Sequence, residues 1–137
     1  MWKWLCLVAV TCLGVAQAAP TVQLDFSGQR VVSIFDLYDD PTCAPRPLRV
    51  KVVKRQFGQD AVTVENFVIE LPDGVRKFVG VDVDMQNLSL NASGWLIRGL
   101  HTLLADGHDV EVIIKSCGAS GHSLMLDAVR EVPPWKH

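Results

Sequence analysis

The chain has 137 residues, with 13 basic and 15 acidic side chains and a formal net charge of −2. This nearly neutral balance excludes a general polyanion-binding protein. The length suits one domain built around one hydrophobic core.

The N-terminus has the three parts of a secretory signal peptide. Lys3 supplies a positive charge, an apolar run follows from 5 to 16, and Ala16-Gln17-Ala18 is the small-x-small pattern that precedes a cleavage site. The apolar run has about a dozen residues, fewer than the roughly 20 that a membrane-spanning helix needs. We therefore expect 1–18 to be removed near Ala18 and the protein to be secreted or periplasmic. An uncleaved membrane anchor is the alternative.

Two cysteines, Cys43 and Cys117, remain after the signal peptide. An even pair in an oxidising compartment predicts a disulfide, which closes a loop of about 75 residues. Two buried free thiols are the alternative.

The first half of the mature chain has the patterns of strands. Apolar side chains predict strands over 21–26 and 30–38, joined by a turn at 27–29. The segment 39–47 is predicted to be a loop, because its three prolines cannot donate to a sheet. Further strands are predicted over 48–56, 61–71 and 75–83, with a turn at 72–74. Breaks in the alternation predict bulges at Val52-Val53 and Glu65-Asn66.

The second half contains one predicted helix and two predicted strands. Leucines recur at helical spacing over 93–105, and the glycine at 107 is placed to end the helix. Gly94 and Gly99 weaken a helix, so we expect tertiary packing to stabilise it. Trp95 lies off the leucine stripe and either contacts a partner or covers the end of a barrel. Strands are predicted over 109–116 and 123–131, and 133–137 is a C-terminal tail.

The order of these elements favours a mainly β fold. A strand hairpin is followed by three strands, a helix and two strands, which is the order of an OB-like five-stranded barrel with one helix between strands 3 and 4. A β-sandwich is the alternative. We expect 19–132 to form a single β-rich domain.

One stretch resembles a known family. The sequence Glu70-Leu71-Pro72-Asp73-Gly74-Val75-Arg76-Lys77-Phe78-Val79-Gly80-Val81-Asp82 is followed by a leucine-rich helix and two strands. Over about 48–131, the chain is similar to the thermonuclease-like (staphylococcal nuclease-type) OB-fold domains. The resemblance implies an OB-fold barrel.

The chemistry of that family is carried over only in part. The resemblance implies a Ca²⁺ site at Asp60 and Asp82. Lys77 stands at the position of the family's first arginine, Met85 at that of its glutamate and His122 at that of its second arginine. Without those groups to position water and grip phosphate, phosphodiester cleavage loses its main supports. The resemblance therefore implies a relative that lacks the catalytic residues.

A basic cluster suggests a contact surface. The cluster consists of Arg46, Arg49, Lys51, Lys54 and Arg55. Arg49 and Lys51 alternate with apolar residues along one predicted strand, and Lys77 lies on another. The candidate binding residues for an anionic partner are Arg49, Lys51 and Lys77. The alternative is a solvated strand whose charges prevent edge pairing.

No catalytic motif is present, and no cofactor is expected other than Ca²⁺ in the alternative function. We expect an exported, non-enzymatic binding or assembly module of the bacterial periplasm or exterior, with an anionic or protein partner. One alternative is a calcium-dependent thermonuclease-like phosphodiesterase. Another is a structural or inhibitory protein that acts only through protein contacts. Asn87 and Asn91 match the glycosylation pattern, which matters only in a eukaryotic secretory pathway.

Overall fold

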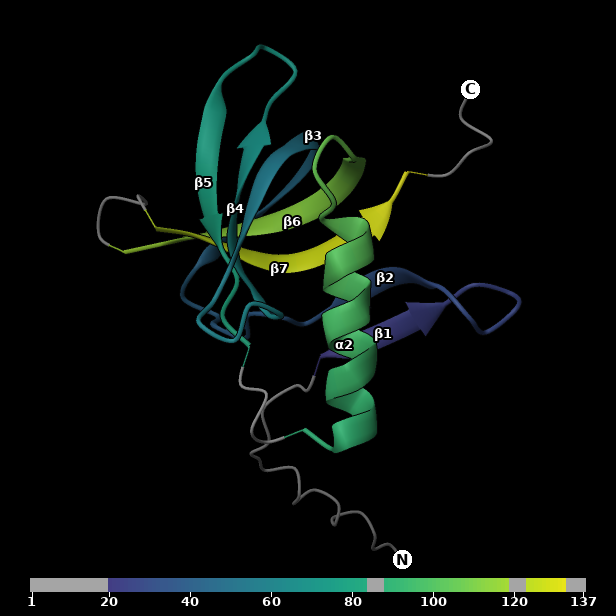
Figure 1. Ribbon diagram of the computed structural model, residues 1–137. Helices are drawn as coiled ribbons and strands as arrows, with labels where there is room; N and C mark the ends of the chain where they lie inside the picture. Colours follow the sequence, from purple (N-terminus) through teal and green to yellow (C-terminus); the bar gives the residue numbers. More distant parts are fainter. Residues whose placement is uncertain (1–19, 84–87, 119–122, 133–137) are drawn as a thin grey trace, which may run out of the picture.

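The computed structural model describes residues 20–83, 88–118 and 123–132. The predicted signal peptide, the tail, Met85, Asn87 and His122 lie outside these described residues. Seven strands and one helix follow one another along the described chain (Figure 1): β1 Thr21–Leu24, β2 Val31–Phe35, β3 Ala44–Phe57, β4 Val64–Glu70, β5 Arg76–Gly80, α2 Leu90–Leu103, β6 Asp109–Cys117 and β7 Ser123–Glu131.

Five of the strands form a closed barrel. β3 pairs with β4 and β4 with β5, while β6 lies between β7 and the first half of β3. The circle closes through one parallel contact between β5 and β7, where Gly80 faces Met125. This arrangement confirms the predicted OB-like barrel with the helix between its third and fourth strands, and it rules out the sandwich. The predicted N-terminal hairpin is also confirmed, because β1 pairs with β2 and β2 extends the sheet beside β7.

The two bulges predicted from the sequence are both present in the β3–β4 pair. The pairing passes from Val52 to Lys54 and from Asn66 to Val64, so Val53 and Glu65 have no direct partner. Bulges increase the local bend of a strand. They therefore help β3 to curve from β6 to β4, as closing the barrel requires.

The prediction that 39–47 is a loop is wrong in its second half, because β3 begins at Ala44. Pro45 and Pro47 lie within the strand, opposite Lys115 and Ile113 of β6. The amide of Val52 donates to the carbonyl oxygen of His108 beside β6, so even-numbered residues of β3 bond on that side. The proline nitrogens point to the opposite edge, where a strand tolerates proline.

The helix α2 packs on β2 and on one end of the barrel. The hydroxyl of Ser89 accepts a hydrogen bond from the amide of Ala92 at 3.1 Å and so caps its first turn. The predicted leucine stripe is confirmed, since Leu96, Leu100, Leu103 and Leu104 are all buried. The helix begins three residues earlier than predicted, at Leu90, because this capping residue precedes the stripe.

The outer elements complete the core. Trp95 packs against the core and lines a small hollow between α2 and β1, which is not a strand of the barrel. The strand predicted over 75–83 begins one residue later, at Arg76, and Val75 is exposed at the hairpin turn. Within 20–83, 88–118 and 123–132, no helix is long and apolar enough to cross a membrane.

Candidate functional site

Arg49 and Lys51 lie where the sequence placed them, on the outer face of β3. Both are exposed and alternate with the buried Val50. The register puts Glu111 opposite Arg49, and it puts Asp109 and Glu70 opposite Lys51 on the two neighbouring strands. Directly opposite residues point to the same face of a sheet. This face therefore has mixed charge, and two of its carboxylates, Glu70 and Glu111, form ion pairs with Arg76 and Arg130.

A shallow groove lies beside Arg49 on the outer face of β3, β6 and β7. Its volume is about 530 Å³, and its lining includes Phe35, Pro47, Ile113 and Ala128. The charged side chains at its rim have both signs, and the guanidinium of Arg130 donates to the carboxylate of Glu111 at 2.6 Å. The groove has an apolar floor, and its charged lining residues are two arginines and one glutamate.

Lys77, the third candidate, is separate from the other two. It lies in phase with Val79, whose side chain is buried inside the barrel, so Lys77 lies on the inner side of β5 rather than the outer side. Its side chain lines a pocket of about 150 Å³ at the end of the barrel. We call this the barrel-end pocket; it is lined by Arg46, Leu48, Ile69, Leu71, Lys77, Ile114, Ser116 and Leu124.

The barrel-end pocket combines positive charge with an apolar interior. Arg46 and Lys77 are exposed, and neither forms an ion pair with any described residue. Ser116 adds a hydroxyl group, the other five lining residues are aliphatic, and no carboxylate lines the pocket among the described residues. Such a lining suits a group that carries a negative charge on an apolar stem.

Sequence reasoning missed Arg46 as the partner of Lys77. The signal was present, because Arg46 is in phase with Leu48 and Val50, which lie on the inner side of the same strand. Treating 39–47 as a loop removed Arg46 from that alternation. Only the pairing of β3 with β6 brings it to the end of the barrel where β5 begins.

Asp60 and Asp82, the two residues that the resemblance assigns to a Ca²⁺ site, line one groove. The groove has a volume of about 700 Å³ and runs between the β3–β4 connection and the end of β5, with Glu65 and Met125 also in its lining. No group of three or more potential ligands within the described residues is arranged to hold a metal ion.

The carboxylate of Asp60 is occupied by its own turn. One oxygen accepts hydrogen bonds from the amides of Val62 and Thr63, both at 2.9 Å, and the other accepts from the Thr63 hydroxyl at 2.6 Å. That hydroxyl, followed by the two amides, lowers the pKa of Asp60 to about 2. The ionised carboxylate stabilises the turn above the ordinary pKa of 3.8, and this contribution is lost as the pH falls through about 2.

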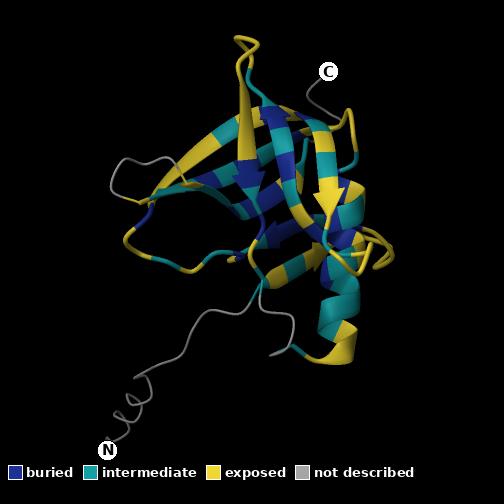
Figure 2. Cartoon of the chain, turned by 60° about the vertical axis from the view of Figure 1, so that its left-hand side comes forward, coloured by how far each residue is buried: buried dark blue, intermediate teal, exposed yellow. Residues whose placement is uncertain are grey.

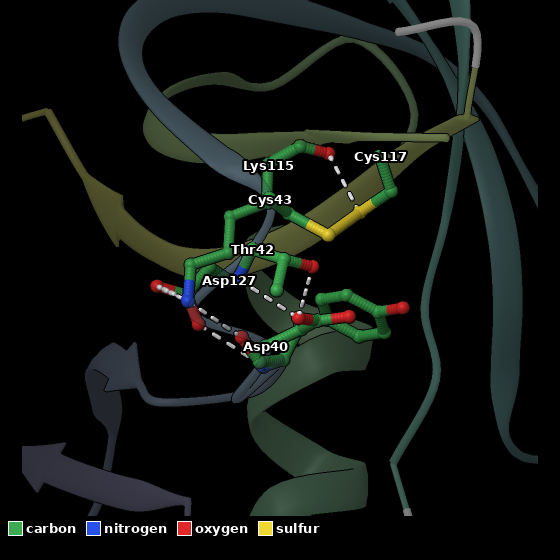
Figure 3. Close-up of a disulfide and its surroundings, with 7 residues drawn as sticks. Asp40, Thr42, Cys43, Lys115, Cys117 and Asp127 are labelled. Atoms are coloured by element: carbon green, nitrogen blue, oxygen red, sulfur yellow. Dashed lines mark hydrogen bonds and ion pairs between the residues drawn. A yellow bond between two sulfur atoms is a disulfide. The ribbon is translucent and has the colours of Figure 1, made fainter. Parts of the chain in front are cut away.

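The predicted disulfide joins Cys43, just before β3, to Cys117 at the end of β6 (Figure 3). An ion pair lies close to it. The Lys115 ammonium is 3.7 Å from a carboxylate oxygen of Asp127 and donates to the carbonyl oxygen of Tyr38 at 2.9 Å. The other carboxylate oxygen of Asp127 accepts from the Tyr38 amide at 3.0 Å. These contacts hold the segment between β2 and β3 against the barrel.

Asp127 owes its position to a third bulge. The pairing of β6 with β7 passes from Ala128 to Leu126, so Asp127 has no direct partner. The amide of Leu37 donates to its carbonyl oxygen at 2.8 Å. No local sequence pattern predicted this bulge. The polar contacts of Asp127 come from Leu37 and Tyr38, about 90 positions away, and from Lys115 on the neighbouring strand.

Comparisons with protein-family models, with curated proteins and with solved structures found no match to this chain. The resemblance to thermonuclease-like domains therefore remains a prediction.

Proposed function

We propose that this protein is an exported, non-enzymatic binding module that takes a carboxylate-bearing, partly apolar group of its partner in the barrel-end pocket. One observation carries the proposal. Two cations without ion-pair partners among the described residues, Arg46 and Lys77, share a pocket with five aliphatic side chains. A carboxylate bound there meets two positive charges, while its apolar stem is buried among the leucine and isoleucine side chains.

The balance of charge on the outer face favours this pocket over the surface around Arg49. Arg49 and Lys51 each lie opposite carboxylates of neighbouring strands. Nearby carboxylates lower the local positive potential, so an anion gains less on this face than in a pocket whose described lining residues include no carboxylate. This supports the interpretation of Arg49 and Lys51 as a solvated strand face.

The turn at 58–63 supports a binding function over the calcium-dependent alternative. Both carboxylate oxygens of Asp60 accept hydrogen bonds within that turn. Calcium binding requires six or more oxygen ligands from several groups. Asp60 already uses three of its lone-pair sites in these contacts, and no group of three or more potential ligands is arranged to hold a metal ion within the described residues.

Export is supported by the cysteines. The disulfide between Cys43 and Cys117 is typical of proteins that fold outside the reducing cytosol. Together with the N-terminal pattern of charge, apolar run and small-x-small site, it supports a secreted or periplasmic protein.

An NMR titration tests the binding pocket. The oxidised, exported protein, labelled with ¹⁵N, is titrated with millimolar 4-methylpentanoate and, separately, with the neutral 4-methylpentanamide. We expect the carboxylate to shift the amide signals of Lys77, Ser116 and Leu124, and the neutral amide to leave them unchanged, because only the carboxylate pairs with the two cations.

Two variants with the same charge change provide the control. Lys77→Glu is expected to abolish the shifts, whereas Lys51→Glu, on the outer face, leaves them intact. Equal shifts with 4-methylpentanamide, or an equal loss in Lys51→Glu on a folded protein, would contradict the proposal.

A further inference from the structure

One edge of β5 has no partner strand next to the barrel-end pocket. β5 pairs with β4 along its whole length, but it meets β7 only at Gly80. Two backbone hydrogen bonds mark the ends of the β4–β5 ladder. The amide of Leu71 donates to the carbonyl oxygen of Val75, and the amide of Val81 donates to the carbonyl oxygen of Glu65. Hydrogen-bonded pairs alternate along an antiparallel ladder, so the odd-numbered residues of β5 bond to β4.

The even-numbered residues of β5 therefore point their backbone groups away from β4. The N–H and C=O groups of Arg76 and Phe78 face an edge where they pair with no described strand. β5 is exposed from Arg76 to Phe78, and the β4–β5 hairpin projects beyond the rest of the barrel (Figure 1, Figure 2). The side chain of Phe78 is 59% exposed, which is unusual for an aromatic ring in the middle of a strand.

The open edge of β3 and the open edge of β5 carry different residues. On the first half of β3, the proline nitrogens of Pro45 and Pro47 occupy the edge that faces away from β6. Prolines at an edge prevent another strand from pairing there. The edge of β5 has no proline and carries an exposed aromatic ring. The charges of Arg76 and Lys77 discourage pairing with most strands, so this edge is open to strand addition by a segment that carries negative charge.

We propose that an extended peptide segment of a partner protein adds to this edge of β5 as a further strand and places an acidic side chain in the barrel-end pocket. The proposal rests on the proposed function and names its partner class. Directly opposite residues in paired strands point to the same face. A peptide residue opposite Lys77 therefore points towards the pocket, and the residues on either side of it lie on the face of Phe78.

Charge complementarity selects an acidic peptide rather than a second copy of this chain. In an antiparallel pairing of two β5 edges centred on Lys77, the two lysines face each other, and Arg46 brings further positive charge to the same pockets. A peptide with the order apolar–acidic–apolar supplies the missing negative charge and covers Phe78. Main-chain hydrogen bonds to Arg76 and Phe78 then provide the register.

The probe is the fluorescein-labelled peptide Thr-Val-Glu-Val-Thr with blocked ends, and binding to the oxidised, exported protein is followed by fluorescence anisotropy. We expect saturable binding that weakens about tenfold when the central glutamate is replaced by glutamine. The backbone amides of the peptide are also methylated one at a time. Methylation of an amide that faces β5 is expected to abolish binding, whereas methylation of an amide that faces away from β5 should have no effect. A uniform effect of N-methylation would overturn strand addition.

Protein variants give an independent test. Arg76→Pro removes an outward N–H at the first residue of β5, where a strand tolerates proline, whereas Arg76→Gln removes the same charge and keeps the donor. We expect the peptide to bind at least ten times more weakly to the Arg76→Pro variant than to the Arg76→Gln variant. If Arg76→Pro does not fold, the N-methylation series decides the question with the unaltered protein.

Two further outcomes distinguish a failure of strand addition from a failure of the proposed function. If 4-methylpentanoate occupies the pocket but the peptide does not bind, strand addition is wrong and the proposed function holds. If the carboxylate also fails to bind, both are wrong. A dimer in analytical ultracentrifugation that Arg76→Pro disrupts, with no peptide binding, would assign the edge to a second copy and overturn the proposed occupant.

Discussion

Gly99 shows how one side chain controls the packing of an element. A Cβ atom at this position would lie 2.8 Å from Cγ1 of Val31 and 3.0 Å from Cδ1 of Ile34, both on β2. Val31 is β-branched and has little freedom to move aside. The glycine therefore lets α2 approach β2 closely, at a cost in helix propensity that the packing offsets.

Gly99→Ala is therefore expected to destabilise the protein, although alanine is the better helix former. Overpacking costs about 1–3 kcal/mol, against a gain of up to about 1 kcal/mol in helix propensity. Gly94→Ala is the matched control on the same helix, because nothing lies within 4 Å of its added Cβ atom. Urea unfolding should show Gly94→Ala to be stabilised by about 0.5–1 kcal/mol. Equal effects of the two changes would contradict this account.

At the scale of elements, Asp127 joins three parts of the fold. Its carboxylate contacts Lys115 of β6 and the amide of Tyr38, and its own backbone accepts from Leu37. The two charged side chains are only about 15% exposed. Removal of one member of such a pair leaves the other partly buried and without its charge partner.

We expect Asp127→Ala to lower the free energy of unfolding by about 2–3 kcal/mol, because it removes the charge partner of Lys115 and the acceptor for the Tyr38 amide. Asp127→Asn keeps an acceptor for that amide and should lose less. Hydrogen exchange of the Tyr38 amide reports on the contact directly: faster exchange is expected in the alanine variant. Unchanged exchange there would show that the segment is held by other contacts.

At the scale of the whole molecule, the disulfide links the start of β3 to the end of β6, 74 positions apart in the sequence. The same strands are already neighbours along the β3–β6 ladder. The bond therefore adds little to the shape of the barrel and acts mainly by restricting the unfolded chain.

Reduction of this bond should cost about 2–5 kcal/mol of stability while leaving the barrel folded under mild conditions. Intact mass of the native protein checks both the bond and export: we expect a chain that begins at Ala19 and gains two hydrogen atoms with reductant. Guanidinium unfolding of the oxidised and reduced forms gives the difference in stability. A native chain that retains residues 1–18, or equal stability of the two forms, would contradict this interpretation.

The amino-acid sequence by itself determined the local features of this protein. The alternation of apolar residues predicted the barrel strands, the two breaks predicted the bulges at Val53 and Glu65, and the leucine spacing predicted the buried face of α2. Each of these signals depends on residues a few positions apart, so it can be read along the chain. The cysteine pair was also readable, because only two cysteines remain after the predicted cleavage site.

Only the tertiary structure decided which distant residues meet. Pro45 and Pro47 lie in a strand because one edge of β3 lacks a partner there, and Arg46 consequently joins Lys77 at the end of the barrel. The same pairing places carboxylates opposite Arg49 and Lys51, so the apparent basic cluster lies on a face of mixed charge. Register between strands depends on packing and turn geometry across the whole barrel, and no local pattern in the sequence records it.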